Sequence, residues 1–64
     1  FAAGVRATLA GMDPREAEAL VLRFGLDGSP EWSYRRIGRH LGTSDHTARR
    51  LVERAQARLR RLVD

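Results

Sequence analysis

The chain has 64 residues, no cysteine and a formal net charge of +4. This length allows one small domain, and without cysteine there can be no disulfide and no cysteine-held zinc. No apolar stretch is long enough for a membrane span or a signal-peptide core. We therefore expect a single domain over residues 1–64 that works in the cytoplasm. Because it begins with Phe1, we expect it to be cut from a longer protein.

The charge is unevenly distributed along the chain. All 12 basic residues are arginine. Residues 1–32 hold three arginines and five acidic residues, whereas residues 33–64 hold nine arginines and three acidic residues. A basic half of this kind favours a polyanionic partner, most often nucleic acid. The alternative is a solvated helix surface held by salt bridges.

Glycine and proline divide the chain into four predicted helices, and no strand-like alternation persists. The first covers residues 2–10, with Val5 and Leu9 on its apolar side. The second starts at Pro14, because Asp13 is a suitable N-cap, Pro14 suits the first helical position and Glu16 stands where a capping box needs it. It ends at Gly25. A loop rich in turn-forming residues follows.

The third and fourth predicted helices lie close together in the sequence. The third covers residues 34–41, capped by Ser33 and stopped by Gly42, and the fourth runs from the cap Ser44 to the C-terminus. A short helix, a tight turn containing glycine and a longer basic helix are typical of a helix-turn-helix. The predicted fold is therefore all-α, a compact four-helix domain with a C-terminal helix-turn-helix.

Helical periodicity separates two faces of the fourth helix. At about 100° per residue, one face is an apolar stripe made of Ala48, Leu51, Val52, Ala55, Leu59 and Leu62. A second face, at the start of the helix, holds Asp45, His46, Arg49, Arg50 and Glu53. The N-terminal turns of a recognition helix enter the major groove, so this face is a candidate DNA reader. Ordinary solvent exposure is the alternative. The residues expected to be buried are Val5, Leu9, Leu20, Phe24, Ile37, Leu41, Leu51 and Ala55.

The sequence does not favour catalysis, a metal or a cofactor. Its two histidines, His40 and His46, lie on different predicted helices, with no cysteine and no paired carboxylates near them in the sequence. We expect His40 on a helix surface, and Trp32 and Tyr34 as anchors of the core or of a loop. The expected protein is not an enzyme and takes no small-molecule substrate.

Two stretches resemble the bacterial sigma-70 family. Residues 13–20 (DPREAEAL) and 22–28 (LRFGLDG) resemble region 4.1. Residues 37–42 (IGRHLG) and Ser44, followed by Arg54-Ala55 and Arg58-Leu59-Arg60, resemble region 4.2, its helix-turn-helix. The resemblance implies a winged-helix-like sigma domain 4, with region 4.1 at about residues 1–28 and region 4.2 at about residues 33–64. Such a domain is cytoplasmic and nucleoid-associated. It binds the promoter −35 element and docks on the flap tip of the RNA polymerase β subunit.

The resemblance also implies roles for particular residues. The residues in base-reading positions are Asp45, His46, Arg49 and Arg50. Those in phosphate-contacting positions are Arg15, Arg23, Ser44 and Arg54. The patch touched by activators corresponds to Arg54, Arg58 and Arg60. An activator or an anti-sigma factor is therefore a further expected partner.

The chain departs from the primary sigma factors on the base-reading face. Of their usual Arg-Glu-Arg-Val-Arg-Gln run, only Arg49 is kept, and their acidic pair after the third helix's cap is Arg35 and Arg36 here. Asp45 repels phosphate or accepts a hydrogen bond from cytosine. Ser44 with Thr47-Ala48 instead resembles the extracytoplasmic-function branch. Two other readings stay open: a sigma-like interaction module that does not read DNA, and a LuxR-type DNA-binding domain.

Overall fold

The computed structural model describes residues 10–63, with side chains to residue 61, and these residues form helices and turns without a strand. The helices are α2 (Pro14–Phe24), α3 (Tyr34–Leu41) and α4 (Asp45–Val63). The all-α class and the helix-turn-helix of α3 and α4 are confirmed. The described residues hold three helices where the sequence predicts four, because the predicted first helix, apart from Ala10, lies outside them.

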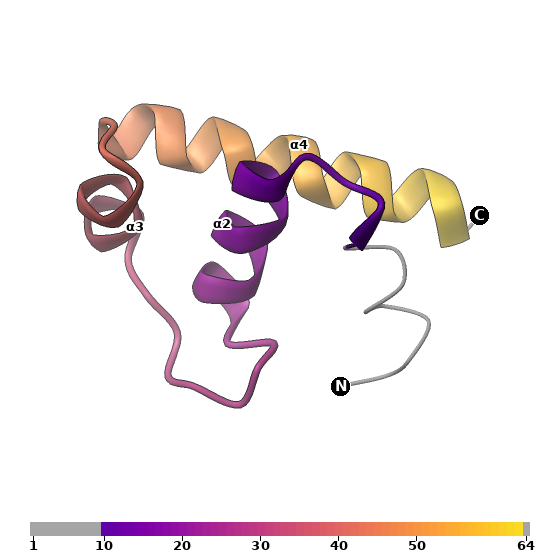
Figure 1. Cartoon of the computed structure of the whole chain (residues 1–64), viewed down its shortest axis with the longest axis horizontal. Coiled ribbons are helices and arrows are strands. Elements are labelled where there is room, and N and C mark those ends of the chain that lie inside the picture. The colour runs from indigo at the N-terminus through magenta and orange to yellow at the C-terminus, as the bar shows by residue number, and fades with distance from the viewer. Residues whose placement is uncertain (1–9, 64) are drawn as a thin grey trace.

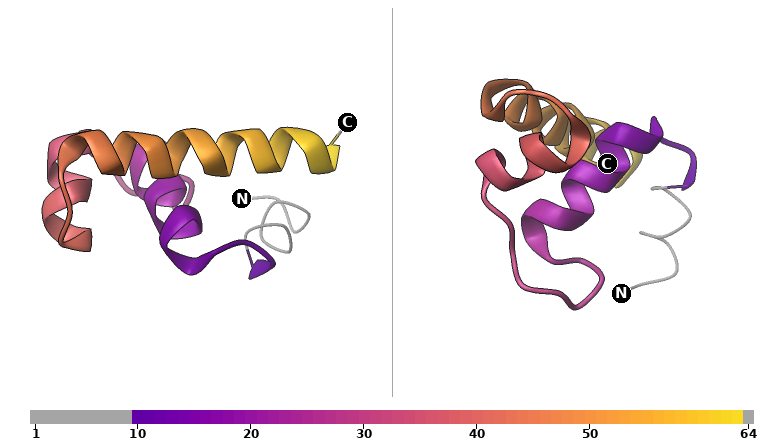
Figure 2. Two further views of the ribbon diagram at one scale, coloured as in Figure 1. Left: turned by 90° about the horizontal axis from the view of Figure 1, so that it is seen from above. Right: turned by 60° about the vertical axis from the view of Figure 1, so that its left-hand side comes forward.

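Helix α4 runs along the long axis of the domain (Figure 1). Its 19 residues span about 28 Å at 1.5 Å per residue, close to the longest dimension of 30 Å. Helices α2 and α3 both pack against α4 and only lightly against each other. Seen from above, they lie on the same side of it (Figure 2). A loop over residues 25–33 joins α2 to α3, whereas only residues 42–44 separate α3 from α4.

Each helix starts at the cap that the sequence predicts. The Asp13 carboxylate accepts hydrogen bonds from the backbone N–H groups of Arg15 (2.9 Å) and Glu16 (3.4 Å). In the same way, the hydroxyl of Ser33 caps α3, and that of Ser44 caps α4. These side chains satisfy backbone donors that a helix start leaves free.

The turn between α3 and α4 depends on glycine at two places. Gly42 ends α3 with φ of 73°, a left-handed conformation that glycine adopts at little cost. The N–H of Thr43 then donates to the Gly38 carbonyl at 2.8 Å. A Cβ atom at Gly38 would lie 2.8 Å from the Thr43 carbonyl oxygen and 2.9 Å from the Ser44 carbonyl group. At residue 38, α3 therefore lies so close to the backbone of the turn that only glycine, which has no Cβ, fits.

The buried core is drawn from all three helices and the segment before α2, and consists of Met12, Ala19, Leu20, Ile37, Ala48, Val52 and Ala55. For the predicted apolar stripe of α4, burial is confirmed at Ala48, Val52 and Ala55, and the half-buried Leu59 packs against the core. The side chain of Leu62 lies outside the described part of the chain. Burial is also confirmed for Leu20 and Ile37, whereas Leu41 and Leu51 are only half-buried.

One core prediction is wrong, and two cannot be compared with the structure. Phe24 is 39% exposed because it is the last residue of α2, whose buried residues, Ala19 and Leu20, lie at the middle of the helix. Val5 and Leu9 lie outside the described residues. The sequence pattern missed Met12, which precedes the helix that it helps to cover.

Candidate nucleic-acid interface

The first turns of α4 present a polar, solvent-exposed face. Asp45, His46, Arg49 and Arg50 are all exposed on this face, as the periodicity predicts. Thr47 is half-buried instead. Its backbone N–H donates to the Ser44 hydroxyl at 3.1 Å, and the Ser44 hydroxyl donates to the Thr47 hydroxyl at 3.1 Å. Thr47 therefore belongs to the cap of the helix and not to its exposed face.

The exposed face carries both signs of charge. The Asp45 carboxylate accepts a hydrogen bond from the backbone N–H of His46 at 2.8 Å, which holds it at the helix start. Arg49 Nε lies 3.6 Å from Glu53 Oε2, with the two side chains 63% and 57% exposed. Such an exposed pair contributes at most about 1 kcal/mol, so the Arg49 guanidinium can leave Glu53 for a stronger partner.

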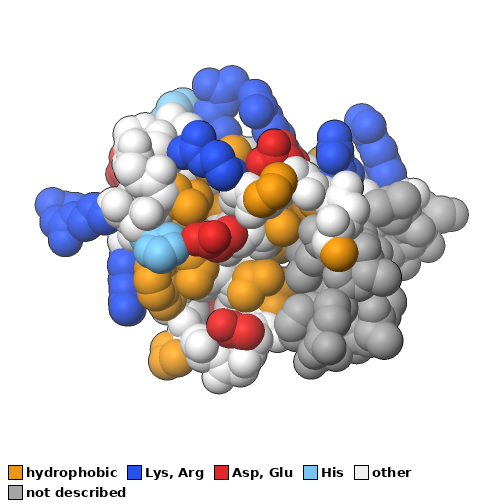
Figure 3. Space-filling view, in the orientation of Figure 1, with side chains coloured by type: hydrophobic (Ala, Val, Ile, Leu, Met, Phe, Trp, Pro, Cys, Tyr) orange, Lys and Arg blue, Asp and Glu red, His pale blue; other side chains and the backbone are white. Residues whose placement is uncertain are grey.

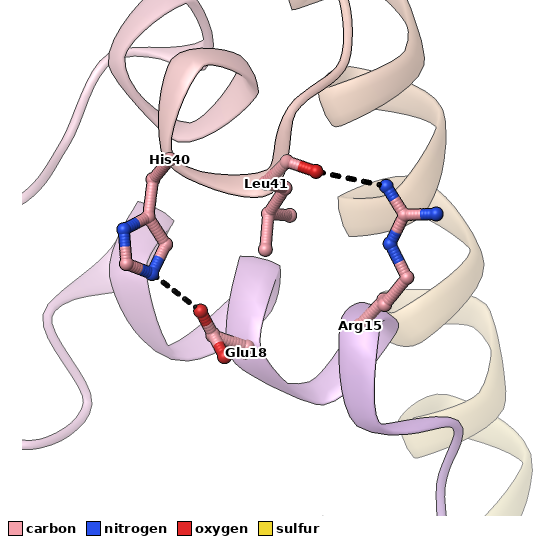
Figure 4. Close-up of polar contacts among 4 residues, drawn as sticks. All are labelled: Arg15, Glu18, His40 and Leu41. Atoms are coloured by element: carbon pink, nitrogen blue, oxygen red, sulfur yellow. Dashed lines mark hydrogen bonds and ion pairs between the residues drawn. The ribbon is translucent and has the colours of Figure 1, made fainter.

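Three of the four residues predicted to contact phosphates are exposed on the surface, and they differ in how far their side chains are engaged in hydrogen bonds. Arg15, at the start of α2, donates from Nη2 to the Leu41 carbonyl at 3.2 Å (Figure 4). This bond ties α2 to the end of α3 and leaves the rest of the guanidinium open. Arg54 is exposed on α4. Ser44 is also exposed, but its hydroxyl is engaged with Thr47.

The fourth, Arg23, is used inside the protein. Its Nη1 donates to the Trp32 carbonyl at 3.0 Å, and its guanidinium carbon lies 4.4 Å from the centre of the Tyr34 ring. Its Nε is buried without a hydrogen-bond partner among the described residues. The Trp32 N–H donates in turn to the Leu22 carbonyl at 3.0 Å. Arg23 thus closes the loop between α2 and α3, and it would have to leave these contacts to reach a phosphate.

A cluster of aromatic and charged side chains, which the sequence pattern did not reveal, holds α2, α3 and the loop together. His40 Nε2 lies 2.6 Å from Glu18 Oε1, joining α3 to α2 (Figure 4). The Trp32 ring meets the His40 ring edge-on at 5.5 Å, and the Arg36 guanidinium lies 3.9 Å from the centre of the Trp32 ring. Trp32 is therefore the loop anchor that the sequence predicts, and His40 is on the surface as expected.

A second basic surface lies farther along α4. Arg54, Arg58 and Arg61 line a shallow pocket of about 210 Å³ together with Glu16 and Ala57. Of the three arginines predicted to form a patch for activators, Arg54 and Arg58 are thus brought together. Arg60 does not line this pocket; Arg61 does, because it follows Arg54 by seven residues and shares its side of the helix.

On the face of the domain drawn in Figure 3, most basic side chains are separated from most acidic ones. Figure 3 shows basic side chains along the upper edge, over α4, and at the left, over α3. Acidic and apolar side chains predominate between them, over α2, with basic atoms beside the acidic ones in the upper middle. Helix α2 with its flanking residues therefore presents a different kind of surface from the helix-turn-helix.

These features describe a helix-turn-helix with exposed arginines on both of its helices, and a sequence comparison names its family. The model of the family "Sigma-70, region 4" matches residues 8–61. Since this match covers most of the chain, the protein belongs to the sigma-70 region 4 family, whose members bind DNA and RNA polymerase and are not enzymes. The match favours this family over the LuxR-type alternative. No significant match to a solved structure was found. None of the helices in the described part of the chain is long and apolar enough to span a membrane.

Proposed function

We propose that this domain binds the −35 element of promoter DNA as domain 4 of a sigma factor, and that it docks on the flap tip of the RNA polymerase β subunit. One observation carries the DNA part of the proposal. In a family of DNA-binding domains, the second helix of the helix-turn-helix leaves Asp45, His46, Arg49 and Arg50 exposed at its first turns. These are the turns that enter the major groove in helix-turn-helix proteins.

The chemistry of this face suggests an unusual −35 element. Arg49 and Arg50 can each donate a fork of hydrogen bonds to the O6 and N7 atoms of guanine or to a phosphate. The ionised carboxylate of Asp45 accepts hydrogen bonds but donates none. The major-groove donor that suits it is the N4 amino group of cytosine. Because Asp45 also repels phosphates, we expect modest sequence discrimination and a large electrostatic part in the affinity of this domain.

The phosphate contacts would flank the base-reading face. Arg15 and Ser44 lie near the turn that leads into α4, since Arg15 donates to the Leu41 carbonyl just before it. Arg54 follows Asp45 by nine residues, about 14 Å along the helix axis. Arg23 contributes only if it releases Trp32 and Tyr34.

The flap tip would use the other side of the domain. Helix-in-groove binding depends on a few apolar anchors, and α2 leaves apolar side chains partly open at Ala17, Val21 and Phe24. The resemblance implies a groove lined by the first two predicted helices and the start of α4. Of the first of these, residues 2–10, only Ala10 is described, so we propose α2 as the docking surface. The arginine surface around Arg54, Arg58 and Arg61 is the proposed site for an acidic activator or an anti-sigma factor.

An NMR titration of the 64-residue chain tests both contacts at once. A duplex that carries a −35 element should shift the amide signals of residues 44–53, whereas a flap-tip peptide should shift those of α2. If the peptide moves only the 45–53 face, the docking proposal fails. If the duplex moves nothing, the DNA proposal fails and a pure interaction module is favoured, a second candidate that the negative charge of Asp45 supports.

A further inference from the structure

Helix α3 has two edges with different surroundings. Arg36 and His40 are four residues apart and share one edge, which is occupied: Arg36 lies over the Trp32 ring, and His40 is paired with Glu18. Arg35 and Arg39 share the other edge. Both are exposed, and neither forms an ion pair or a side-chain hydrogen bond with another described residue. Two arginines with free guanidinium groups therefore stand side by side.

The free edge lies nearer to the start of α4 than the occupied edge does. Gly38 touches the backbone of Thr43 and Ser44, so the side of α3 on which Gly38 lies is the side toward the turn. At about 100° per residue, Arg35 lies about 60° and Arg39 about 100° from Gly38 around the helix, whereas Arg36 and His40 lie about 160° from it. Of the two edges, the free edge is thus the one nearer to Ser44 and to the base-reading face.

We propose that Arg35 and Arg39 form a phosphate-binding edge that grips the DNA strand bordering the groove entered by α4. The inference rests on the proposed DNA binding. The first helix of a helix-turn-helix crosses the DNA backbone when the second enters the major groove, and the arginine fork matches the oxygens of a phosphate. The edge supplies sequence-independent attraction next to a base-reading face on which Asp45 offsets part of the positive charge.

The decisive variant is the double substitution Arg35→Gln/Arg39→Gln, measured by fluorescence anisotropy over a salt series. Each lost phosphate contact lowers the magnitude of the log K against log [salt] slope by about 0.9, so the double variant should lose about 1.8. Its affinity should fall by the same factor for a −35 duplex and a scrambled duplex. Arg35→Lys/Arg39→Lys should keep most of the slope. Both side chains are exposed, so thermal unfolding should be unchanged.

The matched control is Arg58→Gln/Arg61→Gln. It removes the same charge from α4 about 20 Å beyond Asp45 and should leave the slope within about 0.5 of that of the parent. An unchanged slope in Arg35→Gln/Arg39→Gln while the parent chain binds would overturn this inference alone. An equal loss in the control would also overturn it, because the effect would then be one of net charge. A parent chain that binds neither duplex at low salt would overturn the proposed function and this inference with it.

Discussion

Replacing Gly38 with alanine tests whether the angle between α3 and α4 is set by a backbone contact. In an open helix position, alanine is favoured over glycine by about 1 kcal/mol. Here the added Cβ would lie 2.8 Å from the Thr43 carbonyl oxygen, where ordinary contact begins at 3.4 Å. The atoms in its way are backbone, and the Thr43 N–H to Gly38 carbonyl bond of 2.8 Å holds them in place.

The steric cost should exceed the gain in helix propensity. Overpacking of this kind costs about 1–3 kcal/mol. After a propensity gain of about 1 kcal/mol is subtracted, Gly38→Ala should reduce the free energy of unfolding by up to about 2 kcal/mol, or about 1 kcal/mol at the middle of the range. In a domain of this size, that lowers Tm by about 4–8 °C. Because the turn must shift to admit the Cβ, the start of α4 moves with it. DNA affinity should therefore fall more than stability alone explains.

Thermal unfolding followed by circular dichroism measures the first effect, and fluorescence anisotropy on a duplex measures the second. Ala57→Gly is the calibration, since Ala57 is exposed within α4. It should cost about 1 kcal/mol through helix propensity and leave the binding of DNA at the helix start unchanged. If Gly38→Ala instead raised the Tm, as at an open helix position, the idea that the backbone of Thr43 and Ser44 leaves no room for a Cβ at residue 38 would be refuted.

Two further predictions concern the core and the loop. Leu20→Ala should cost about 2–5 kcal/mol in chemical denaturation, and the exposed Phe24→Ala should cost clearly less; equal losses would contradict the packing described here. The backbone N–H of Ser29 lowers the pKa of Asp27. The resulting stabilisation is therefore present above the unfolded-state pKa and is lost as the pH falls through the folded-state pKa. An NMR titration that placed the Asp27 pKa above its ordinary value would contradict this.

The local signals in the sequence predict the helices well. Caps at Asp13, Ser33 and Ser44 mark the helix starts, because a side chain that satisfies nearby backbone donors acts within a few residues. Periodicity identifies the buried stripe of α4 and its opposite, exposed face, because both depend only on the geometry of one long helix.

Features that depend on the packing of different helices could not be predicted in this way. The Glu18–His40 pair joins residues 22 positions apart, and Arg23 meets the Trp32 carbonyl only because the loop folds back over it. Phe24 has the periodicity of a core residue but lies at the end of α2. Arg61 is a different case: its spacing of seven residues from Arg54 places both on one side of α4, but the family resemblance assigns the patch to Arg60.

Binding of the domain to two duplexes over a salt series tests the central claim most directly. Fluorescence anisotropy should show binding to a −35 duplex and, more weakly, to a scrambled one, with an affinity that falls steeply as salt rises. Arg49→Ala should cost about 1–3 kcal/mol on the preferred duplex and much less on the scrambled one, whereas Arg54→Ala should weaken both alike. Absence of binding to either duplex at low salt would contradict the claim that this domain reads DNA.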